Sequence, residues 1–181
     1  ERKEQIESLL VKVNLTSQKN KEVHTFSGGM RQRFGVAQAL LGNPKIIIVD
    51  EPTAGLDPEE RNRFNGLLTE IGTDRIVILS THLVEDVRNL CSQMAIMRNG
   101  KVLAQGKPND FVAELEGKIW EKQIQKEELE LYKTNFNVIA SHYIGGNLNV
   151  KVFSKEKLSG FETVNPTLED VYFKTLNQIK S

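Results

Sequence analysis

The stretch Ile46-Ile47-Ile48-Val49-Asp50-Glu51-Pro52 decides the fold, because an aliphatic run ends abruptly in two acids and a proline. A continuous run of β-branched residues is typical of a central parallel strand that is covered on both faces. A second run, Ile76-Val77-Ile78-Leu79, stops in the same way at Ser80-Thr81-His82. Ligands of parallel sheets bind beyond the carboxyl ends of the strands. The candidate site residues are therefore Asp50, Glu51 and His82.

Helical patterns lie on both sides of these strands. One follows a glycine pair at 28–29 and stops at Gly42-Asn43-Pro44. Another begins at Asp57-Pro58-Glu59-Glu60, which supplies an N-cap, a proline at the first helical position and an acid at the third. A third follows His82, and its predicted inward face consists of Leu83, Val87, Leu90 and Cys91. Alternating strands and helices with short links predict an α/β layered structure.

The composition and the pattern of predicted elements change after Gly117. Before it, residues 94–105 form a predicted hairpin around the turn sequence Asn99-Gly100. After it, the pattern predicts a strand at 118–124, a charged helix at 126–133, a hairpin made of 138–144 and 148–153, and a final helix at 166–179. We interpret the single tryptophan, Trp120, as a packing anchor. The predicted division is residues 1–116, which carry the motifs, and residues 117–181, a small α+β accessory subdomain without a catalytic group.

The composition excludes several classes of protein. Lys plus Arg and Asp plus Glu both number 24 in 181 residues, so no general attraction to polyanions exists and we expect no nucleic-acid partner. The single cysteine, Cys91, excludes an internal disulfide framework and a cysteine-based zinc site, and it suits a reducing cytosol. No apolar stretch approaches the ~20 residues that span a bilayer. We therefore expect the protein to serve any membrane from the aqueous side.

The acids after the first strand fit nucleotide chemistry. Asp50, at the strand tip, would hold Mg²⁺ directly or through water, and Glu51, aimed differently, would orient or deprotonate an attacking water. The structural alternative is an acidic turn from strand to loop. His82 would contact a phosphate. The alternative interpretation is that His82 is a structural histidine whose hydrogen bonds are made within the fold.

A second candidate is an anion site at Ser27-Gly28-Gly29. These residues precede a helix, so free backbone N–H groups and the positive end of the helix dipole point the same way. Missing side chains would let a phosphate approach. The structural alternative is a flexible turn in which Ser27 is only the helix N-cap.

Four motifs, in order and spacing, closely resemble those of the ATPase subunits of ATP-binding cassette (ABC) transporters. They are Phe26-Ser-Gly-Gly-Met-Arg-Gln-Arg33, Ile46-Ile-Ile-Val-Asp-Glu-Pro-Thr53, Ala54-Gly-Leu-Asp-Pro58 and Ser80-Thr-His82. The resemblance covers residues 1–115 and is weaker beyond them. It implies the C-terminal part of a P-loop NTPase (RecA-like) cassette with part of its helical subdomain.

The resemblance implies a role for each motif. The signature motif, which contacts the γ-phosphate of ATP held by the opposite subunit, contains Ser27, Gly28 and Gly29. Asp50 matches the Walker B acid, and Glu51 matches the catalytic glutamate. Residues 54–57, which end in Asp57, match the D-loop, and His82 matches the switch histidine.

One motif of the family is missing from this sequence. A P-loop needs Gly-x-x-x-x-Gly-Lys-[Ser/Thr], whose backbone amides and lysine hold the phosphates. The Gly-Lys pairs at 100–101, 106–107 and 117–118 are followed by other residues. Phe26 and Met30 also stand where the signature commonly has leucine and glutamine. We therefore expect the C-terminal portion of a cassette, with Walker A and the Q-loop upstream, and we expect this chain alone to be inactive.

The resemblance also implies what the parent protein does. Such subunits couple the binding and hydrolysis of ATP, with Mg²⁺, to a transmembrane permease. They pair head to tail with a second ATPase subunit and lie peripherally on the cytoplasmic face of the membrane. Pro166-Thr-Leu-Glu-Asp-Val-Tyr172 is similar to the end of bacterial drug and antibiotic exporters, which favours export. The alternatives are a truncated, non-catalytic cassette that acts as an interaction module, and a DNA-repair or chromosome-maintenance ATPase.

Overall fold

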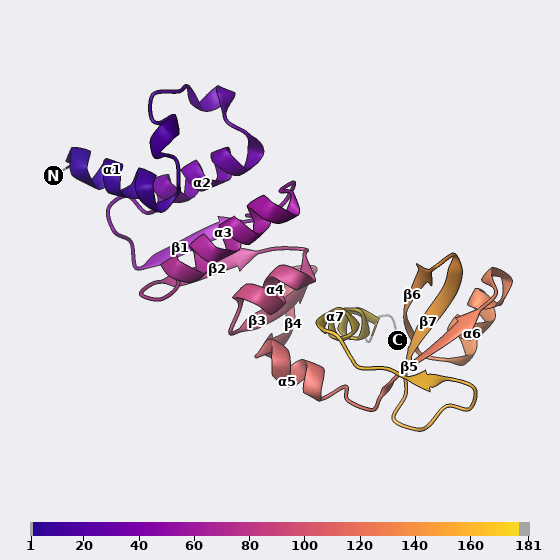
Figure 1. The fold of residues 1–181 in the computed structure, drawn as a ribbon. Coiled ribbons are helices and arrows are strands. Elements are labelled where there is room, and N and C mark those ends of the chain that lie inside the picture. The colour runs from indigo at the N-terminus through magenta and orange to yellow at the C-terminus, as the bar shows by residue number, and fades with distance from the viewer. Residues whose placement is uncertain (1, 178–181) are drawn as a thin grey trace. The chain divides into compact units, whose positions relative to one another are not determined.

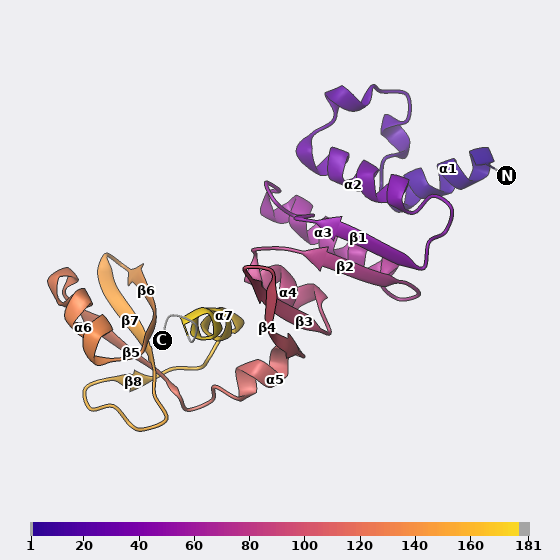
Figure 2. The ribbon, with the colours of Figure 1, turned by 180° about the vertical axis from the view of Figure 1, so that it is seen from behind.

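The computed structural model describes residues 2–177, and Figure 1 and Figure 2 show them from opposite sides. The chain divides into two compact units, Glu1–Leu90 and Cys91–Ser181. Each unit has its own sheet structure, so each is described by itself.

The first unit is an α/β layer built on two parallel strands. Its elements are α1 (Arg2–Lys12), the 3-10 helices η1 (Thr16–Gln18) and η2 (Val23–Thr25), α2 (Gly28–Ala39), β1 (Ile46–Asp50), α3 (Pro58–Ile71), β2 (Ile76–Ser80) and α4 (Val84–Leu90). β1 and β2 pair in parallel, with Asp50 opposite Ser80. The predicted α/β arrangement is confirmed, and both strands end at the same edge of the sheet.

Short-range signals set the ends of the helices. α1 ends where Asn14 takes a left-handed φ of 54° and the N–H of Leu15 donates to the carbonyl oxygen of Leu10 over 2.8 Å, a Schellman-type ending. α3 begins where the Asp57 carboxylate accepts the N–H of Glu60 over 2.9 Å, with proline at the first helical position. The helix start predicted at Asp57 is therefore confirmed.

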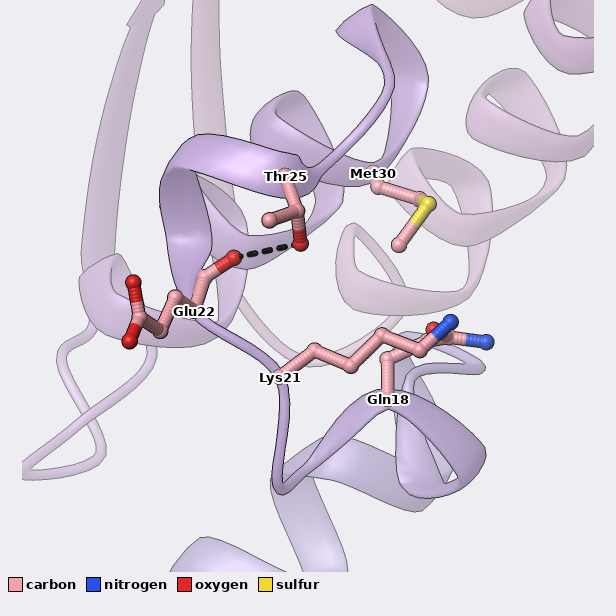
Figure 3. Close-up of a pocket in the computed structure, with 5 residues that line it drawn as sticks. All are labelled: Gln18, Lys21, Glu22, Thr25 and Met30. Atoms are coloured by element: carbon pink, nitrogen blue, oxygen red, sulfur yellow. Dashed lines mark hydrogen bonds between the residues drawn. The ribbon is translucent and has the colours of Figure 1, made fainter.

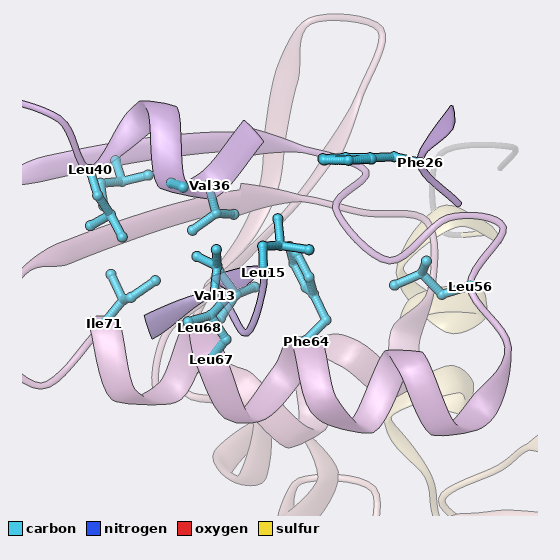
Figure 4. Packing of buried hydrophobic residues seen from close by; sticks show 12 residues of the cluster. Val13, Leu15, Phe26, Val36, Leu40, Leu56, Phe64, Leu67, Leu68 and Ile71 are labelled. Atoms are coloured by element: carbon cyan, nitrogen blue, oxygen red, sulfur yellow. The ribbon is translucent and has the colours of Figure 1, made fainter. Parts of the chain in front are cut away.

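The core of the first unit lies between α2, α3 and one face of the strands (Figure 4). Phe64 and Ile71 of α3 are 2% and 0% exposed. The other buried apolar residues of this core are Val13, Leu15, Phe26, Val36, Ala37, Leu40, Ile47, Leu56, Leu67 and Leu68. Because this core joins residues before and after β1, the two strands are held against α2 and α3.

The strands are covered on one face only, so the prediction of a strand buried on both faces is wrong. Ile47 is 3% exposed, whereas Ile48 is 74% exposed and Ile78 is 51% exposed. Successive side chains of a strand point to opposite faces. The helices therefore pack on the face that carries Ile47, and no element described in the first unit covers the face that carries Ile48. Figure 2 shows β1 and β2 from the side opposite α3.

α4 also differs from the prediction. The residues predicted to face inward, Leu83, Val87, Leu90 and Cys91, are only half-buried, so the core position predicted for Cys91 is wrong. The buried residue of α4 is instead Asp86, at 1% exposure. A carboxylate therefore occupies the best-protected position of this helix.

The second unit contains a hairpin and a four-stranded antiparallel sheet. Its elements are β3 (Met94–Arg98), β4 (Lys101–Gly106), α5 (Pro108–Ala113), β5 (Ile119–Ile124), η3 (Lys126–Glu128), α6 (Leu129–Asn135), β6 (Val138–Ile144), β7 (Asn147–Phe153), β8 (Glu162–Thr163) and α7 (Leu168–Asn177). β3 and β4 join through Asn99 and Gly100, whose φ angles are 50° and 73°, so the predicted tight turn is confirmed. The larger sheet has the order β6-β7-β5-β8.

Two helices cover opposite faces of the larger sheet. Val150 of β7 packs in a cluster with Tyr132 of α6, whereas the next residue, Lys151, pairs with Asp170 of α7. Neighbouring residues of a strand face opposite sides. Trp120 of β5 is 9% exposed, and its indole N–H donates to the carbonyl oxygen of Ser154 over 3.2 Å, which agrees with its interpretation as a packing anchor.

The predicted division after residue 116 falls inside the second unit. The guanidinium of Arg98 in β3 donates to the carbonyl oxygen of Leu176 in α7 over 3.1 Å, so the hairpin and the tail belong to one packed body. The boundary at 116 and 117 stays a prediction about where the ATPase motifs stop. The final helix was predicted to reach residue 179, but residues 178 and 179 lie outside the described residues.

Candidate functional site

Glu51 follows β1 directly and has an unusual backbone. Its φ is 45°, in the left-handed region that non-glycine residues avoid, and its N–H donates to the carbonyl oxygen of Ser80 over 3.0 Å. This hydrogen bond extends the pairing of β1 with β2 by one residue before the chain turns. A conformation of this kind costs about 1–3 kcal/mol and is found most often at functional sites.

The carboxylate of Glu51 lies beside the imidazole of His82. Glu51 Oε2 is 2.8 Å from His82 Nδ1, and the two side chains are 37% and 68% exposed. Glu51 Oε2 itself is closed to solvent and accepts no hydrogen bond, so the imidazole approaches it closely without hydrogen-bond alignment. Next to them, Asp50 Oδ1 accepts the hydroxyl of Ser80. The structure therefore brings Asp50, Glu51 and His82 together at one edge of the sheet.

The edge of the sheet offers one exposed carboxylate, that of Asp50, to a magnesium ion. Among residues 2–177, no group of three or more His, Cys, Asp and Glu side chains is placed to bind a metal. Mg²⁺ usually keeps several waters and takes one or two carboxylates together with substrate phosphates. Asp50 is exposed and supplies one carboxylate, so the residues present fit that mode of binding.

The second part of the site is the beginning of α2. Ser27 is its N-cap, because the Oγ of Ser27 accepts the N–H of Met30 over 3.2 Å. The first N–H groups of a helix, here those of Gly28 and Gly29, have no acceptor within the helix and lie at the positive end of its dipole. The capping role proposed as the structural alternative for Ser27 is thus real, and it leaves the two glycine N–H groups for an anion.

The two glycines are needed for different reasons. A Cβ built on Gly28 meets nothing within 4 Å, so its surroundings are open. A Cβ built on Gly29 would lie 2.5 Å from Oε2 of Glu60 in α3. Gly28 therefore leaves room outside the helix, while Gly29 leaves room for the carboxylate of Glu60.

Two further contacts join α2 to the region around Asp57. Gln32 Nε2 donates to the carbonyl oxygen of Ala54 over 3.2 Å, and Arg33 Nη1 is 2.7 Å from Glu60 Oε2. The side chains of Arg33 and Glu60 are only 10% and 22% exposed. The turn of residues 27–29 and residues 54–57 are therefore held together through α2 and α3, and the carboxylate of Asp57 is engaged as the N-cap of α3.

Sequence reasoning missed Gln32, Arg33 and Glu60 as site residues. A signal existed for Arg33, because it stands three residues after Met30 and four before Ala37, on the inward side of the helical pattern. A charged residue at such a position needs a partner of opposite charge. The identity of that partner, Glu60, depends on how α3 packs and was not predictable from spacing.

A pocket of 520 Å³ lies beside the beginning of α2 (Figure 3). Its lining comes from the two 3-10 helices, the loop between them and α2, and consists of Gln18, Lys21, Glu22, Thr25 and Met30. Thr25 Oγ1 donates to the carbonyl oxygen of Glu22 over 2.7 Å, which stiffens one wall. Met30 therefore borders a pocket next to the turn of residues 27–29.

No helix among residues 2–177 combines the length and the apolar character that crossing a membrane requires.

Comparisons with known proteins point to one family. A family model described as "ABC transporter" matches residues 1–54. "Nod factor export ATP-binding protein I" of Rhizobium etli is 39% identical over 114 residues, which cover 61% of this chain and 35% of that protein. "Uncharacterized ABC transporter ATP-binding protein YxlF" of Bacillus subtilis is 30% identical over 190 residues, covering 96% of this chain and 64% of that protein. The chain thus spans 35% to 64% of the length of these relatives.

Solved structures support the same fold. The structure of cbiO1 from Clostridium perfringens, part of the ABC transporter complex cbiONQ, is similar with a TM-score of 0.57 and 31% identity. The similarity covers 73% of this chain and 51% of that chain.

Proposed function

Because this chain belongs to the ABC transporter ATPase family, we propose that it supplies the signature, Walker B and switch-histidine residues of a subunit that hydrolyses ATP. The observation that carries the proposal is the approach of Glu51 and His82 to 2.8 Å at the ends of two parallel strands, next to Asp50. The left-handed φ of 45° at Glu51 adds support, because strained backbone of this kind clusters at functional sites.

Each residue has a distinct task in this proposal. Asp50 would hold Mg²⁺, which when bound would neutralise charge on the phosphates. Glu51 accepts the proton of the attacking water through its carboxylate, which belongs to a side chain that is 37% exposed. His82 lies over that carboxylate and contacts the phosphate side of the site.

The beginning of α2 serves a second nucleotide. The N–H groups of Gly28 and Gly29, with Ser27, face an ATP held by a second ATPase subunit, paired head to tail. Asp57 belongs to the same surface through the contacts that join α2 and α3. Two ATP sites would then each contain residues of both subunits.

The longer protein transports a compound across the cytoplasmic membrane, in our proposal outward. The Rhizobium etli relative is named for export, and the 166–172 stretch is similar to the end of drug and antibiotic exporters. A transmembrane permease is the partner, and the subunit lies on the cytoplasmic face. The chain of 181 residues contains no Gly-x-x-x-x-Gly-Lys-[Ser/Thr], so we expect it to bind ATP weakly and to hydrolyse none on its own.

The test is Glu51→Gln in a longer form of the protein that carries a P-loop. Glutamine keeps the shape of the side chain and loses the base, so turnover is expected to fall ~10²–10⁴-fold while ATP binding persists. Phosphate release and nucleotide binding are measured side by side. Glu59→Gln is the matched control, because Glu59 is exposed on α3 and pairs with Arg63. Near-normal turnover in Glu51→Gln would refute the assignment of the base.

A further inference from the structure

A buried hydrogen bond joins the same two chain segments that carry Glu51 and His82. The hydroxyl of Thr53 donates to Oδ2 of Asp86. Thr53 is 0% exposed and Asp86 is 1% exposed. Thr53 comes two residues after Glu51, and Asp86 comes four residues after His82. The same two chain segments therefore meet twice, once at the surface and once in the interior.

Asp86 is an unusual choice for this position. It is the buried residue of α4, and its second oxygen, Oδ1, is closed to solvent and accepts no hydrogen bond. Leaving a buried polar group without a partner is unfavourable, and an apolar residue would avoid the cost. The carboxylate of Asp86 therefore lowers the stability of the fold, and it provides a strong, directional acceptor for the hydroxyl of Thr53.

The backbone between His82 and Asp86 is fixed by local hydrogen bonds. The N–H of Leu83 donates to Thr81 Oγ1 over 3.0 Å, and the N–H of Asp86 donates to the carbonyl oxygen of Leu83 over 3.0 Å. A displacement of Asp86 would therefore be passed on to the turn that carries His82.

The surface contact needs such support. The His82 side chain is 68% exposed, and exposed ion pairs hold two side chains only weakly. We propose that Thr53 and Asp86 are positioning residues, whose buried hydrogen bond holds the imidazole of His82 against the carboxylate of Glu51. The catalytic meaning of this arrangement rests on the proposed function, but the arrangement itself does not require ATP.

The experiment is nitrogen-15 NMR of the imidazole groups in the 181-residue chain, at one fixed pH and without nucleotide. Glu51→Gln defines the His82 signal when its carboxylate neighbour is lost. Thr53→Val removes the hydroxyl. It is expected to move the His82 signal at least half as far from the wild-type position as Glu51→Gln does. Thr53→Ser keeps the hydroxyl and is expected to leave the signal at its wild-type position.

The spectrum contains its own control. His142 Nε2 lies 3.1 Å from Glu121 Oε1 in the second unit, so its signal should not move in any of these variants. A folded Thr53→Val chain with an unchanged His82 signal would overturn the proposal. So would an unchanged signal in Glu51→Gln, because the two side chains would then not be in contact.

A double variant separates positioning from stability. Thr53→Val combined with Asp86→Leu replaces both polar partners by apolar groups of similar size, which restores folding if Thr53→Val alone does not fold. The positioning proposal expects a displaced His82 signal in the folded double variant. A wild-type signal there would show that packing alone places the imidazole. The turnover of Glu51→Gln in the longer protein decides the proposed function independently.

Discussion

Asp86 in the first unit and Asp170 in the second are both buried, at 1% and 2% exposure, yet they differ in how many hydrogen bonds their carboxylates accept. Asp170 receives Lys151 Nζ at 3.0 and 3.1 Å, and it also accepts the N–H and the hydroxyl of Thr167. Asp86 receives the hydroxyl of Thr53 on one oxygen and nothing on the other. Buried polar groups normally have hydrogen-bond partners. The unpaired oxygen of Asp86 therefore marks a region whose residues serve function as well as stability.

The largest expected effect comes from breaking the satisfied pair. Asp170→Leu leaves the Lys151 ammonium, whose side chain is 16% exposed, without its partner. The loss of unfolding free energy is expected to be about 3–5 kcal/mol. Urea unfolding followed by Trp120 fluorescence measures it, because the single tryptophan lies in this unit. Glu169→Leu, at an exposed position of the same helix, is the control. A loss below about 1 kcal/mol would contradict the importance of the pair.

The next largest effect distinguishes the two glycines at the beginning of α2, Gly28 and Gly29. Gly29→Ala places a methyl group against the Glu60 carboxylate and disturbs its pairing with Arg33, at an expected cost of about 1–3 kcal/mol. Gly28→Ala adds the same methyl group in open space and should leave stability unchanged or slightly raised. Far-UV circular dichroism during urea unfolding measures both. Equal costs would show that contact with the Glu60 carboxylate is not what requires Gly29.

A smaller effect is expected for Asp86 than for Asp170. Asp86→Leu loses the hydrogen bond from Thr53 but also removes an unsatisfied carboxylate oxygen, so the net loss should be about 1 kcal/mol. The measurement is the same unfolding experiment. A loss as large as that of Asp170→Leu would mean that the two carboxylates serve stability alike, and the contrast between the units would fail.

The smallest effect concerns the strained backbone at Glu51. A left-handed φ costs about 1–2 kcal/mol in an L residue, and the greater chain entropy of glycine offsets about 0.5–1 kcal/mol of that. Glu51→Gly should therefore be more stable than Glu51→Ala by about 0.5–1 kcal/mol. The pair is compared by thermal unfolding. If alanine is as stable as glycine, the φ of 45° carries no strain.

The sequence predicted those features that depend on neighbouring residues. The start of α3 at Asp57 and the tight turn at Asn99 and Gly100 follow from local chemistry, and both are seen. The parallel pairing of β1 with β2 also follows, because their carboxyl ends carry the polar residues. Asp50, Glu51 and His82 could be grouped for the same reason.

Other features depend on what packs against a segment, and the sequence does not encode that locally. The run that contains Ile48 has the composition of a strand covered on both faces, yet Ile48 is 74% exposed. The apolar pattern of α4 placed Leu83 and Cys91 inward, whereas the buried residue is Asp86. Its partner, Thr53, lies 33 positions away in the chain. Only the packed structure brings that pair together.

The uncovered face of β1 and β2 affects the solubility of this chain at high concentration. Four isoleucines, at positions 46, 48, 76 and 78, are 55%, 74%, 60% and 51% exposed. A flat array of β-branched side chains without an intervening charge favours association between molecules as the concentration rises. Sulfate and phosphate buffers strengthen such association because these salts are excluded from apolar surfaces. Replacing Ile48 with lysine would place a charge in the middle of this face, so the variant would stay dispersed at concentrations where the parent chain precipitates.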